Sequence, residues 1–243
     1  MPQTEGPWLS PRLSRAIAEV EALTGRRVAI QSRNGPDSTD RLLVQGYVEQ
    51  DGGTERIWLD GHLPPRAREA TAAHELAHVV QSAEGFPRVK ATTDAGPLSS
   101  ELERLAQRIN FLVLDLHADR WAARRGFDVQ QALASSGLPE VIAAMRDRLS
   151  RNAANSHQPA RLDINTLVMA VDYAALRLRL KRSELADELE RPWLRGWPAS
   201  AMLGRELVGA LARRRFSSPA SCRRAMETVL MKLRVPPELI SIN

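Results

Sequence analysis

The sequence predicts an α+β protein, in which a helix and a small β-sheet are followed by a mostly α-helical half. Alternating apolar and polar residues on both sides of Asp51-Gly52-Gly53 predict a β-hairpin. From about residue 100 to the end, apolar residues recur at three- and four-residue spacing, which is typical of amphipathic helices. With 243 residues, of which 43% are hydrophobic, the chain can bury one substantial core, with or without a small appended domain.

The first elements are justified by their residue patterns in chain order. Residues 11–24 have helical spacing, and residues 26–31 alternate as a strand does before the turn 34–36. Residues 41–49 and 55–60 are the two strands of the hairpin. A helix and a small sheet are therefore expected ahead of the next helix.

That next helix carries the sequence His74-Glu75-Leu76-Ala77-His78. Leu63-Pro64-Pro65 suits its first turn, and Gly85 suits its C-terminal cap. Residues four apart lie on one face of a helix, so both imidazoles can point at one metal ion, with Glu75 beside them. Apart from Glu75, the stretch 71–81 carries no acidic or basic residue other than the two histidines, as a buried helix that bears a metal requires.

This pattern is the HExxH motif, and over about residues 55–126 the chain resembles the zincin metallopeptidases, in particular the gluzincins. The resemblance implies a zincin-like core, made of the small sheet, the HExxH helix and a ligand helix. It also implies that His74 and His78 bind Zn²⁺ and that Glu75 is the general base that takes a proton from a zinc-bound water. Two histidines and a water do not complete a tetrahedral zinc site, so a third protein ligand is needed.

The third ligand is expected on a helix predicted over residues 100–126. Within it, Asp115-Leu116-His117-Ala118-Asp119 resembles the second gluzincin motif, ExxxD, in which the first acid binds zinc and the last orients a ligating histidine. The resemblance implies that Asp115 is the ligand, in the place of the usual glutamate, and that Asp119 is the orienting acid. Because aspartate is one methylene shorter, the two helices would have to come closer.

Glu103 is the alternative third ligand, because residues 103–114 resemble the ligand helix of ImmA/IrrE-type peptidases. It lies about 18 Å along the helix and roughly 120° round it from Asp115, so only one of them can bind the metal. We favour Asp115, because Asp119 is in register with it and Glu103 can form a capping box with Ser100. His117 is about 200° round the helix from both acids and is expected to face away from the metal.

Other residues are candidates for smaller roles. Tyr173 and His157 are candidate stabilisers of the tetrahedral intermediate, whereas His62 is expected in a surface turn. In zincin peptidases an extended substrate pairs with the edge strand beside the cleft, and the strand with residues 56–59 is the expected edge here.

We expect three segments along the chain. Residues 1–126 form the zincin-like core, residues 127–192 a helical continuation that packs on it, and residues 193–243 a basic helical C-terminal segment. Pro192-Trp193 and Trp197-Pro198 interrupt the helical pattern near the second boundary. The main helices expected after Gly126 are those of residues 139–150, 162–180, 200–214 and 219–234.

The positive charge is concentrated at the C-terminal end. Residues 175–243 hold 14 basic and 7 acidic residues, or +7, and since the whole chain is +5 the remainder is −2. Arg213-Arg214-Arg215 and Arg223-Arg224 form the clusters, which would suit nucleic acid or an acidic protein. No aromatic residues are interleaved with the charge, and arginine exceeds lysine by 31 to 3 throughout, so a solvated face is the favoured interpretation.

The remaining features concern the compartment. The chain has no run of 18 apolar residues, and its N-terminus lacks the basic and apolar regions of a signal peptide. The single Cys222 cannot form an internal disulfide. We therefore expect a soluble, cytoplasmic protein of bacterial type with no membrane partner.

Together these observations predict a zinc metallopeptidase that hydrolyses peptide bonds of a specific protein substrate, with a regulatory protein as a further partner. One alternative is a regulatory module that binds a partner protein or nucleic acid on a zincin scaffold with little or no peptidase activity. Another is an amidase that acts on a substrate other than a peptide.

Overall fold

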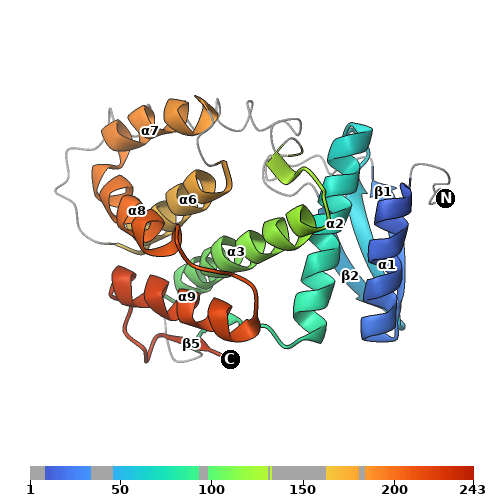
Figure 1. The fold of residues 1–243 in the computed structure, drawn as a ribbon. Coiled ribbons are helices and arrows are strands. Elements are labelled where there is room, and N and C mark those ends of the chain that lie inside the picture. The colour runs from blue at the N-terminus through green and yellow to red at the C-terminus, as the bar shows by residue number, and fades with distance from the viewer. Residues whose placement is uncertain (1–8, 34–45, 93–97, 131, 133–162, 181–183) are drawn as a thin grey trace. The chain divides into compact units, whose positions relative to one another are not determined.

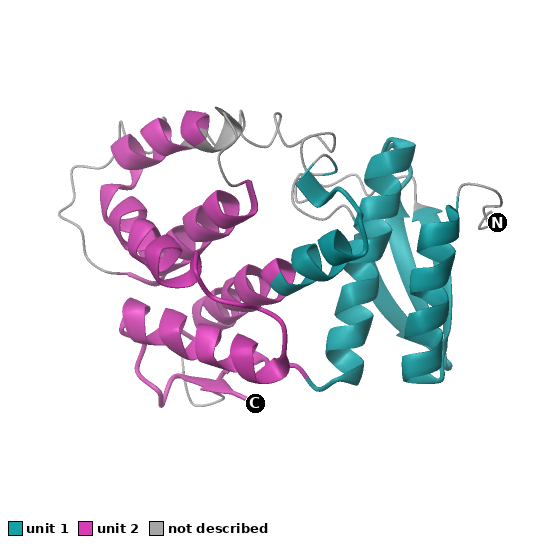
Figure 2. Ribbon diagram, viewed as in Figure 1, with its two compact units in different colours: residues 1–85, 117–141 teal, residues 86–116, 142–243 magenta. Residues whose placement is uncertain are grey.

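The structure is a computed structural model, and its contacts divide the chain into two compact units. Unit 1 comprises residues 1–85 and 117–141, and unit 2 comprises residues 86–116 and 142–243 (Figure 2). The predicted segments 1–126, 127–192 and 193–243 do not coincide with these units, because helix α3 (Ser99–Arg124) contributes to both. The residues that the structure describes are 9–33, 46–92, 98–130, 132, 163–180 and 184–243 (Figure 1).

Unit 1 confirms the predicted order of a helix, a small sheet and a second helix. Helices α1 (Pro11–Thr24) and α2 (Pro65–Ala83) pack side by side and contact strands of one sheet (Figure 1). The sheet has the strand order β1-β3-β2, with β1 parallel and β2 antiparallel to β3. Its strands are β1 (Arg27–Arg33), β2 (Gly46–Asp51) and β3 (Thr54–Asp60).

The expectation that residues 56–59 form the edge strand is wrong. Strand β3 lies between the other two, and Ile57 pairs with Ile30 on one side and with Val48 on the other. Alternation of apolar residues shows which face of a strand is buried, but it does not show which strands pair. Here β1 pairs with β3, although β2 lies between them in the chain. Among the described strands, β1 and β2 therefore lie on the two sides of the sheet and β3 lies between them.

Local capping explains where α1 begins and ends. The Ser10 hydroxyl accepts a hydrogen bond from the backbone N–H of Leu13, and Pro11 occupies the first turn. At the other end Gly25 adopts φ 67°, a left-handed conformation that favours glycine. The helix then buries Leu13 and Val20 against the unit 1 core.

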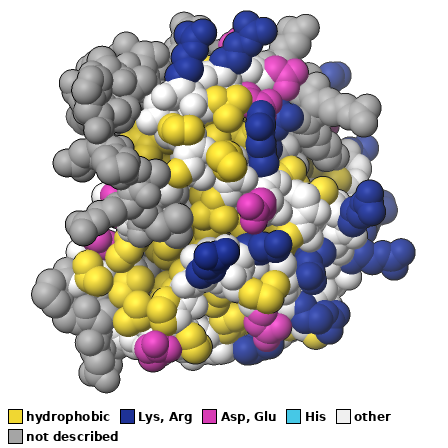
Figure 3. Space-filling view, turned by 90° about the vertical axis from the view of Figure 1, so that its left-hand side faces the viewer, with side chains coloured by type: hydrophobic (Ala, Val, Ile, Leu, Met, Phe, Trp, Pro, Cys, Tyr) yellow, Lys and Arg dark blue, Asp and Glu magenta, His cyan; other side chains and the backbone are white. Residues whose placement is uncertain are grey.

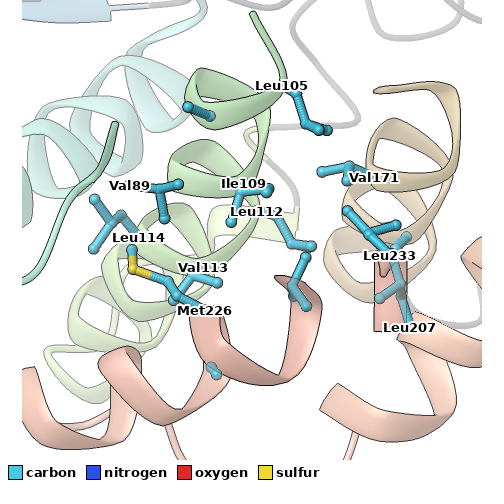
Figure 4. Packing of buried hydrophobic residues seen from close by; sticks show 14 of the residues in the cluster. Val89, Leu105, Ile109, Leu112, Val113, Leu114, Val171, Leu207, Met226 and Leu233 are labelled. Carbon is cyan, nitrogen blue, oxygen red and sulfur yellow. The ribbon is translucent and has the colours of Figure 1, made fainter. Parts of the chain in front are cut away.

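Unit 2 is mostly helical and holds a second hydrophobic core. In Figure 4, side chains from α3, from α6 (Ile164–Leu180), from α8 (Pro198–Leu211) and from α9 (Pro219–Leu233) meet in this core. Strands β4 (Val89–Ala91) and β5 (Ile240–Ile242) form an antiparallel pair at its edge. The Asn110 amide joins β4 to α3, because it accepts from the backbone N–H of Val89 at 2.8 Å and donates to its carbonyl at 2.9 Å.

The predicted helix break at Pro192-Trp193 is wrong, because helix α7 (Glu184–Gly196) runs through it. A proline inside a helix removes one backbone hydrogen bond and typically costs about 3 kcal/mol. Trp193 provides the compensation, since it is fully buried, packs edge-on against Tyr173 and donates its indole N–H to Ser200. The break at Trp197-Pro198 is confirmed, since α8 begins at Pro198.

The architecture is thus mixed α+β and mostly helical. No helix in the described part of the chain combines the length and the apolar character needed to cross a membrane. The predicted turn 34–36, the predicted helix 139–150 and His157 lie outside the described residues.

Candidate metal site

Helix α2 presents the two motif histidines to each other. The Nε2 atoms of His74 and His78 lie 3.1 Å apart. Two nitrogens bound to one tetrahedral zinc, each about 2.0–2.1 Å from it, would be about 3.3 Å apart. The spacing of the two rings therefore fits a shared metal ion.

Asp119 holds the far side of the His74 ring. Its Oδ1 lies 2.8 Å from His74 Nδ1, and both side chains are buried. An ionised carboxylate can only accept, so Nδ1 carries the proton and the unprotonated Nε2 is left for a metal. Asp119 was predicted to orient a ligating histidine, and its contact with His74 is of the kind that this role requires.

The His78 ring is held by the amide of Gln81, a residue that the HExxH pattern does not include. His78 Nδ1 lies 2.9 Å from Gln81 Oε1, and Gln81 Nε2 lies 2.9 Å from His117 Nδ1. Gln81 is 0% exposed and His117 is 2% exposed. Burial lowers the pKa of His117 to about 4, so at neutral pH its ring is uncharged and can accept a hydrogen bond.

His117 therefore does not turn away from this region, as the helical angle suggested, but reaches His78 through Gln81. One sign in the sequence could have pointed to Gln81: it is an uncharged polar residue three positions after His78, where side chains on one helix meet.

Asp115 supplies the third candidate ligand. One ligand atom from each of His74, His78 and Asp115 lies within 4.8 Å of the others, so the three could hold a metal ion. Asp115 Oδ2 also accepts a hydrogen bond from Arg179 at 2.8 Å. A carboxylate has two oxygens with about four acceptor positions, so the arginine and a metal can share it.

Glu75 lies next to His74 on α2 and is only 7% exposed. Strand β2 begins against it, because a Cβ on Gly46 would come within 2.9 Å of Glu75 Cγ and 3.0 Å of the Trp58 carbonyl. Real Cβ atoms essentially never approach so closely, so only glycine allows the strand to lie here. Gly46 was not singled out from the sequence, since nothing local to it indicates this contact.

The other candidate residues lie elsewhere. Glu103 is exposed on α3 and is not in the metal-ligating group. Tyr173 is 2% exposed in unit 2, where its hydroxyl donates to Glu190 Oε1 at 2.8 Å. Burial, followed by this contact, raises the pKa of Tyr173. His62 is exposed in a turn whose backbone N–H donates to Asp60.

Arginines of the predicted basic clusters are mostly exposed, and two of them bind backbone carbonyls. Arg214 donates to Ala210, and Arg223 donates to Ile242 close to the C-terminus. On the face drawn in Figure 3, lysine and arginine side chains form several groups with acidic and hydrophobic side chains between them. The remaining exposed members of the clusters are Arg213, Arg215 and Arg224.

Three candidate ligands, His74, His78 and Asp115, thus lie close together. Asp119 contacts His74, and Glu75 follows His74 on helix α2. Comparisons with protein-family models, with curated proteins and with solved structures each found no match.

Proposed function

We propose that the protein is a zinc-dependent metallopeptidase that hydrolyses peptide bonds of a specific protein substrate. The observation that supports this most directly is the distance of 3.1 Å between the Nε2 atoms of the two histidines. The opposite nitrogen of each ring contacts a supporting side chain, Asp119 for His74 and Gln81 for His78. Two imidazoles and one carboxylate are a donor set typical of catalytic zinc sites, which keep a position open for water.

His74, His78 and Asp115 would hold the ion, and Asp119 orients the His74 ring toward it. When bound, zinc supplies a Lewis acid that makes water more acidic and polarises a carbonyl group. Glu75 accepts the proton of the attacking water and later returns it to the leaving amine. Glu75 is buried beside β2, and this burial would limit the access of competing solvent to its carboxylate.

Strand β2 supports an extended peptide as the substrate. It pairs with β3 and comes last in the sheet order β1-β3-β2. An extended peptide that adds to this outer side would form backbone hydrogen bonds along β2. Because β2 begins at Gly46 against Glu75, such a peptide would pass close to the general base.

The test measures metal content and peptide hydrolysis in the same preparations. Wild type should contain about one zinc per chain, and His74→Ala and His78→Ala should lose it. Glu75→Gln should keep the zinc and lose hydrolysis, because Glu75 moves a proton and does not bind the metal. Glu84→Gln is the matched control, since Glu84 is exposed at the end of the same helix and should change neither property.

Zinc retained in a His74→Ala/His78→Ala double variant would contradict the site. If Glu75→Gln keeps the cellular effect of wild type, the protein is instead a regulatory module on this scaffold. Cleavage of small amides without cleavage of extended peptides would favour an amidase.

A further inference from the structure

Arg88 is an exposed arginine whose backbone is held firmly in unit 2. It lies just before β4, where its N–H donates to the Asn243 carbonyl at 3.2 Å and its carbonyl accepts from the Asn243 N–H at 3.0 Å. The next residue, Val89, is bound through both of its backbone groups to the Asn110 amide. Side chains alternate along an extended chain, so Val89 enters the unit 2 core (Figure 4) and Arg88 is left on the solvent side.

The contact with Asn110 brings Arg88 to the part of α3 that carries the candidate ligand Asp115. Asp115 follows Asn110 by five residues, which is about 7.5 Å along a helix. The electrostatics agree with this placement, because burial lowers the pKa of Arg88 and the negative charge of Asp115 opposes that shift. An arginine remains protonated at neutral pH in spite of such a shift, so Arg88 is a permanent cation.

Asp115 does not form an ion pair with Arg88. Its Oδ2 accepts from Arg179 at 2.8 Å, whereas no carboxylate of the described residues lies within 4.0 Å of the Arg88 guanidinium. If Asp115 binds zinc as proposed, its charge is also taken up by the metal. The charges of the two arginines then favour an anionic group on whatever molecule binds beside them.

We propose that Arg88 binds a carboxylate of the peptide substrate, from an acidic side chain or from the free C-terminus, close to the bond that is cleaved. This inference rests on the metallopeptidase function proposed above and specifies its substrate class. A guanidinium group can bind a carboxylate through two parallel hydrogen bonds, which makes the contact directional as well as strong. Arg88 is thus a specificity-determining residue and takes no part in proton transfer.

The competing explanation is a solvated arginine that attracts anions only through its charge. Lys90 is the matched control for this explanation, because it lies two residues further along the chain, is exposed and carries the same charge. General attraction would act through both residues. The proposed contact needs Arg88 alone.

The first experiment measures binding without turnover. Two degenerate libraries of short peptides, one with free C-terminal carboxylates and one with C-terminal amides, are passed over immobilised, zinc-loaded Glu75→Gln protein, and the retained peptides are sequenced by mass spectrometry. A side-chain carboxylate predicts enrichment of aspartate and glutamate at one position in both libraries. A terminal carboxylate predicts retention of the free library alone. Adding Arg88→Gln to this protein should abolish either preference.

The second experiment measures hydrolysis of two retained sequences that differ only in whether the selected carboxylate is present or replaced by its amide. In wild type the carboxylate should raise kcat/KM by about 10- to 100-fold, as expected for a hydrogen bond between charged groups, mainly through a lower KM. Arg88→Gln should remove this ratio, and Arg88→Lys should keep part of it, since lysine retains the charge but not the paired hydrogen bonds. Lys90→Gln should keep all of it. Zinc content should be the same in all of these proteins.

The outcomes separate this inference from the proposed function. Hydrolysis without a preference for the carboxylate, or a preference that persists in Arg88→Gln, would overturn the role of Arg88 while the metallopeptidase function stands. An equal loss in Lys90→Gln would overturn it too, since general attraction would then explain the preference. If wild type hydrolyses no peptide, the proposed function fails, yet a preference that depends on Arg88 in the binding experiment would still support the carboxylate site.

Discussion

Asp115 is a candidate metal ligand whose carboxylate also accepts a hydrogen bond from Arg179. An arginine on a ligating carboxylate fixes its orientation, and such supporting contacts commonly strengthen a metal site. The arginine also draws negative charge from the carboxylate, which would weaken its binding to a metal, so the two effects on metal affinity oppose each other.

We expect Asp115→Asn to lower zinc affinity by at least about 100-fold, because a neutral amide is a much poorer zinc ligand than a carboxylate. The variant can still offer an oxygen to Arg179, so the packing of α3 and α6 should persist. Glu103→Gln is the control on the same helix and should leave affinity unchanged. Affinity measured by chelator competition decides between them: if only Glu103→Gln weakens binding, the alternative ligand register is correct.

Asp119→Ala should weaken zinc binding by about 10- to 100-fold, since His74 then loses the acceptor of its Nδ1 proton. Titration of the purified protein with zinc measures this change. An unchanged affinity would mean that the ring of His74 is positioned by packing alone.

Gly46→Ala should reduce peptide hydrolysis by about 10- to 100-fold without removing the metal, because the new methyl group would displace Glu75 or β2. Gly209→Ala on α8 is the matched control, since a Cβ there meets nothing within 4 Å. Zinc content and hydrolysis are measured together. Full activity in Gly46→Ala would show that the position of Glu75 beside β2 is not needed.

At the scale of elements, helix α7 shows how a buried side chain outweighs a local helix breaker. Pro192 disfavours the helix, but the burial of Trp193 and its contacts with Tyr173 and Ser200 favour it. Gly204 on α8 packs against Tyr173 on α6, since a Cβ on Gly204 would come within 2.5 Å of Tyr173 Cδ1. The three helices therefore pack around one aromatic pair.

We expect Trp193→Leu to lower the free energy of unfolding by about 2–4 kcal/mol, because it replaces a large, fully buried side chain with a smaller one and removes the indole N–H that donates to Ser200. Met202→Ala, at a site 64% exposed on α8, should change it by less than about 0.5 kcal/mol. Urea denaturation measures both. A small effect of Trp193→Leu would mean that α7 is not held by this contact.

At the scale of the whole molecule, the basic C-terminal segment suggests that the substrate is selected by docking as well as by contacts near the scissile bond. Attraction to exposed arginines is electrostatic, so it weakens when salt rises from about 0.05 to 0.3 M and the Debye length shortens. Arg214 and Arg223 already bind backbone carbonyls, so the arginines suited to the test are Arg213, Arg215 and Arg224.

We expect Arg213→Ser, Arg215→Ser and Arg224→Ser together to slow cleavage of a native protein substrate and to leave a short peptide that spans its cleavage site unaffected. The control changes three exposed arginines outside this segment, Arg15, Arg27 and Arg66, to serine and so alters the net charge equally. Rates on both substrates are compared at low and high salt. Equal rates for all proteins on both substrates would leave the basic segment as a solvated face.

Features that depend on residues close together in the chain can be predicted from the sequence. Helical spacing was sufficient to place His74 and His78 on one face of a helix, because residues four apart always meet there. The hairpin turn at Gly52 and Gly53, which both adopt positive φ, follows equally from local residues. The start of α1 at Pro11 is local too, since Ser10 caps it.

Contacts between residues far apart in the chain could not be predicted from the sequence and became known only from the fold. Gln81 meets His117 across 36 positions, Asp115 meets Arg179 across 64, and β1 pairs with β3 after an intervening strand. Local patterns specify which face of an element is apolar, but many partners satisfy the same face. The partner is selected by the packing of the whole unit, because a buried polar group must find its hydrogen bond among whatever residues the fold brings beside it.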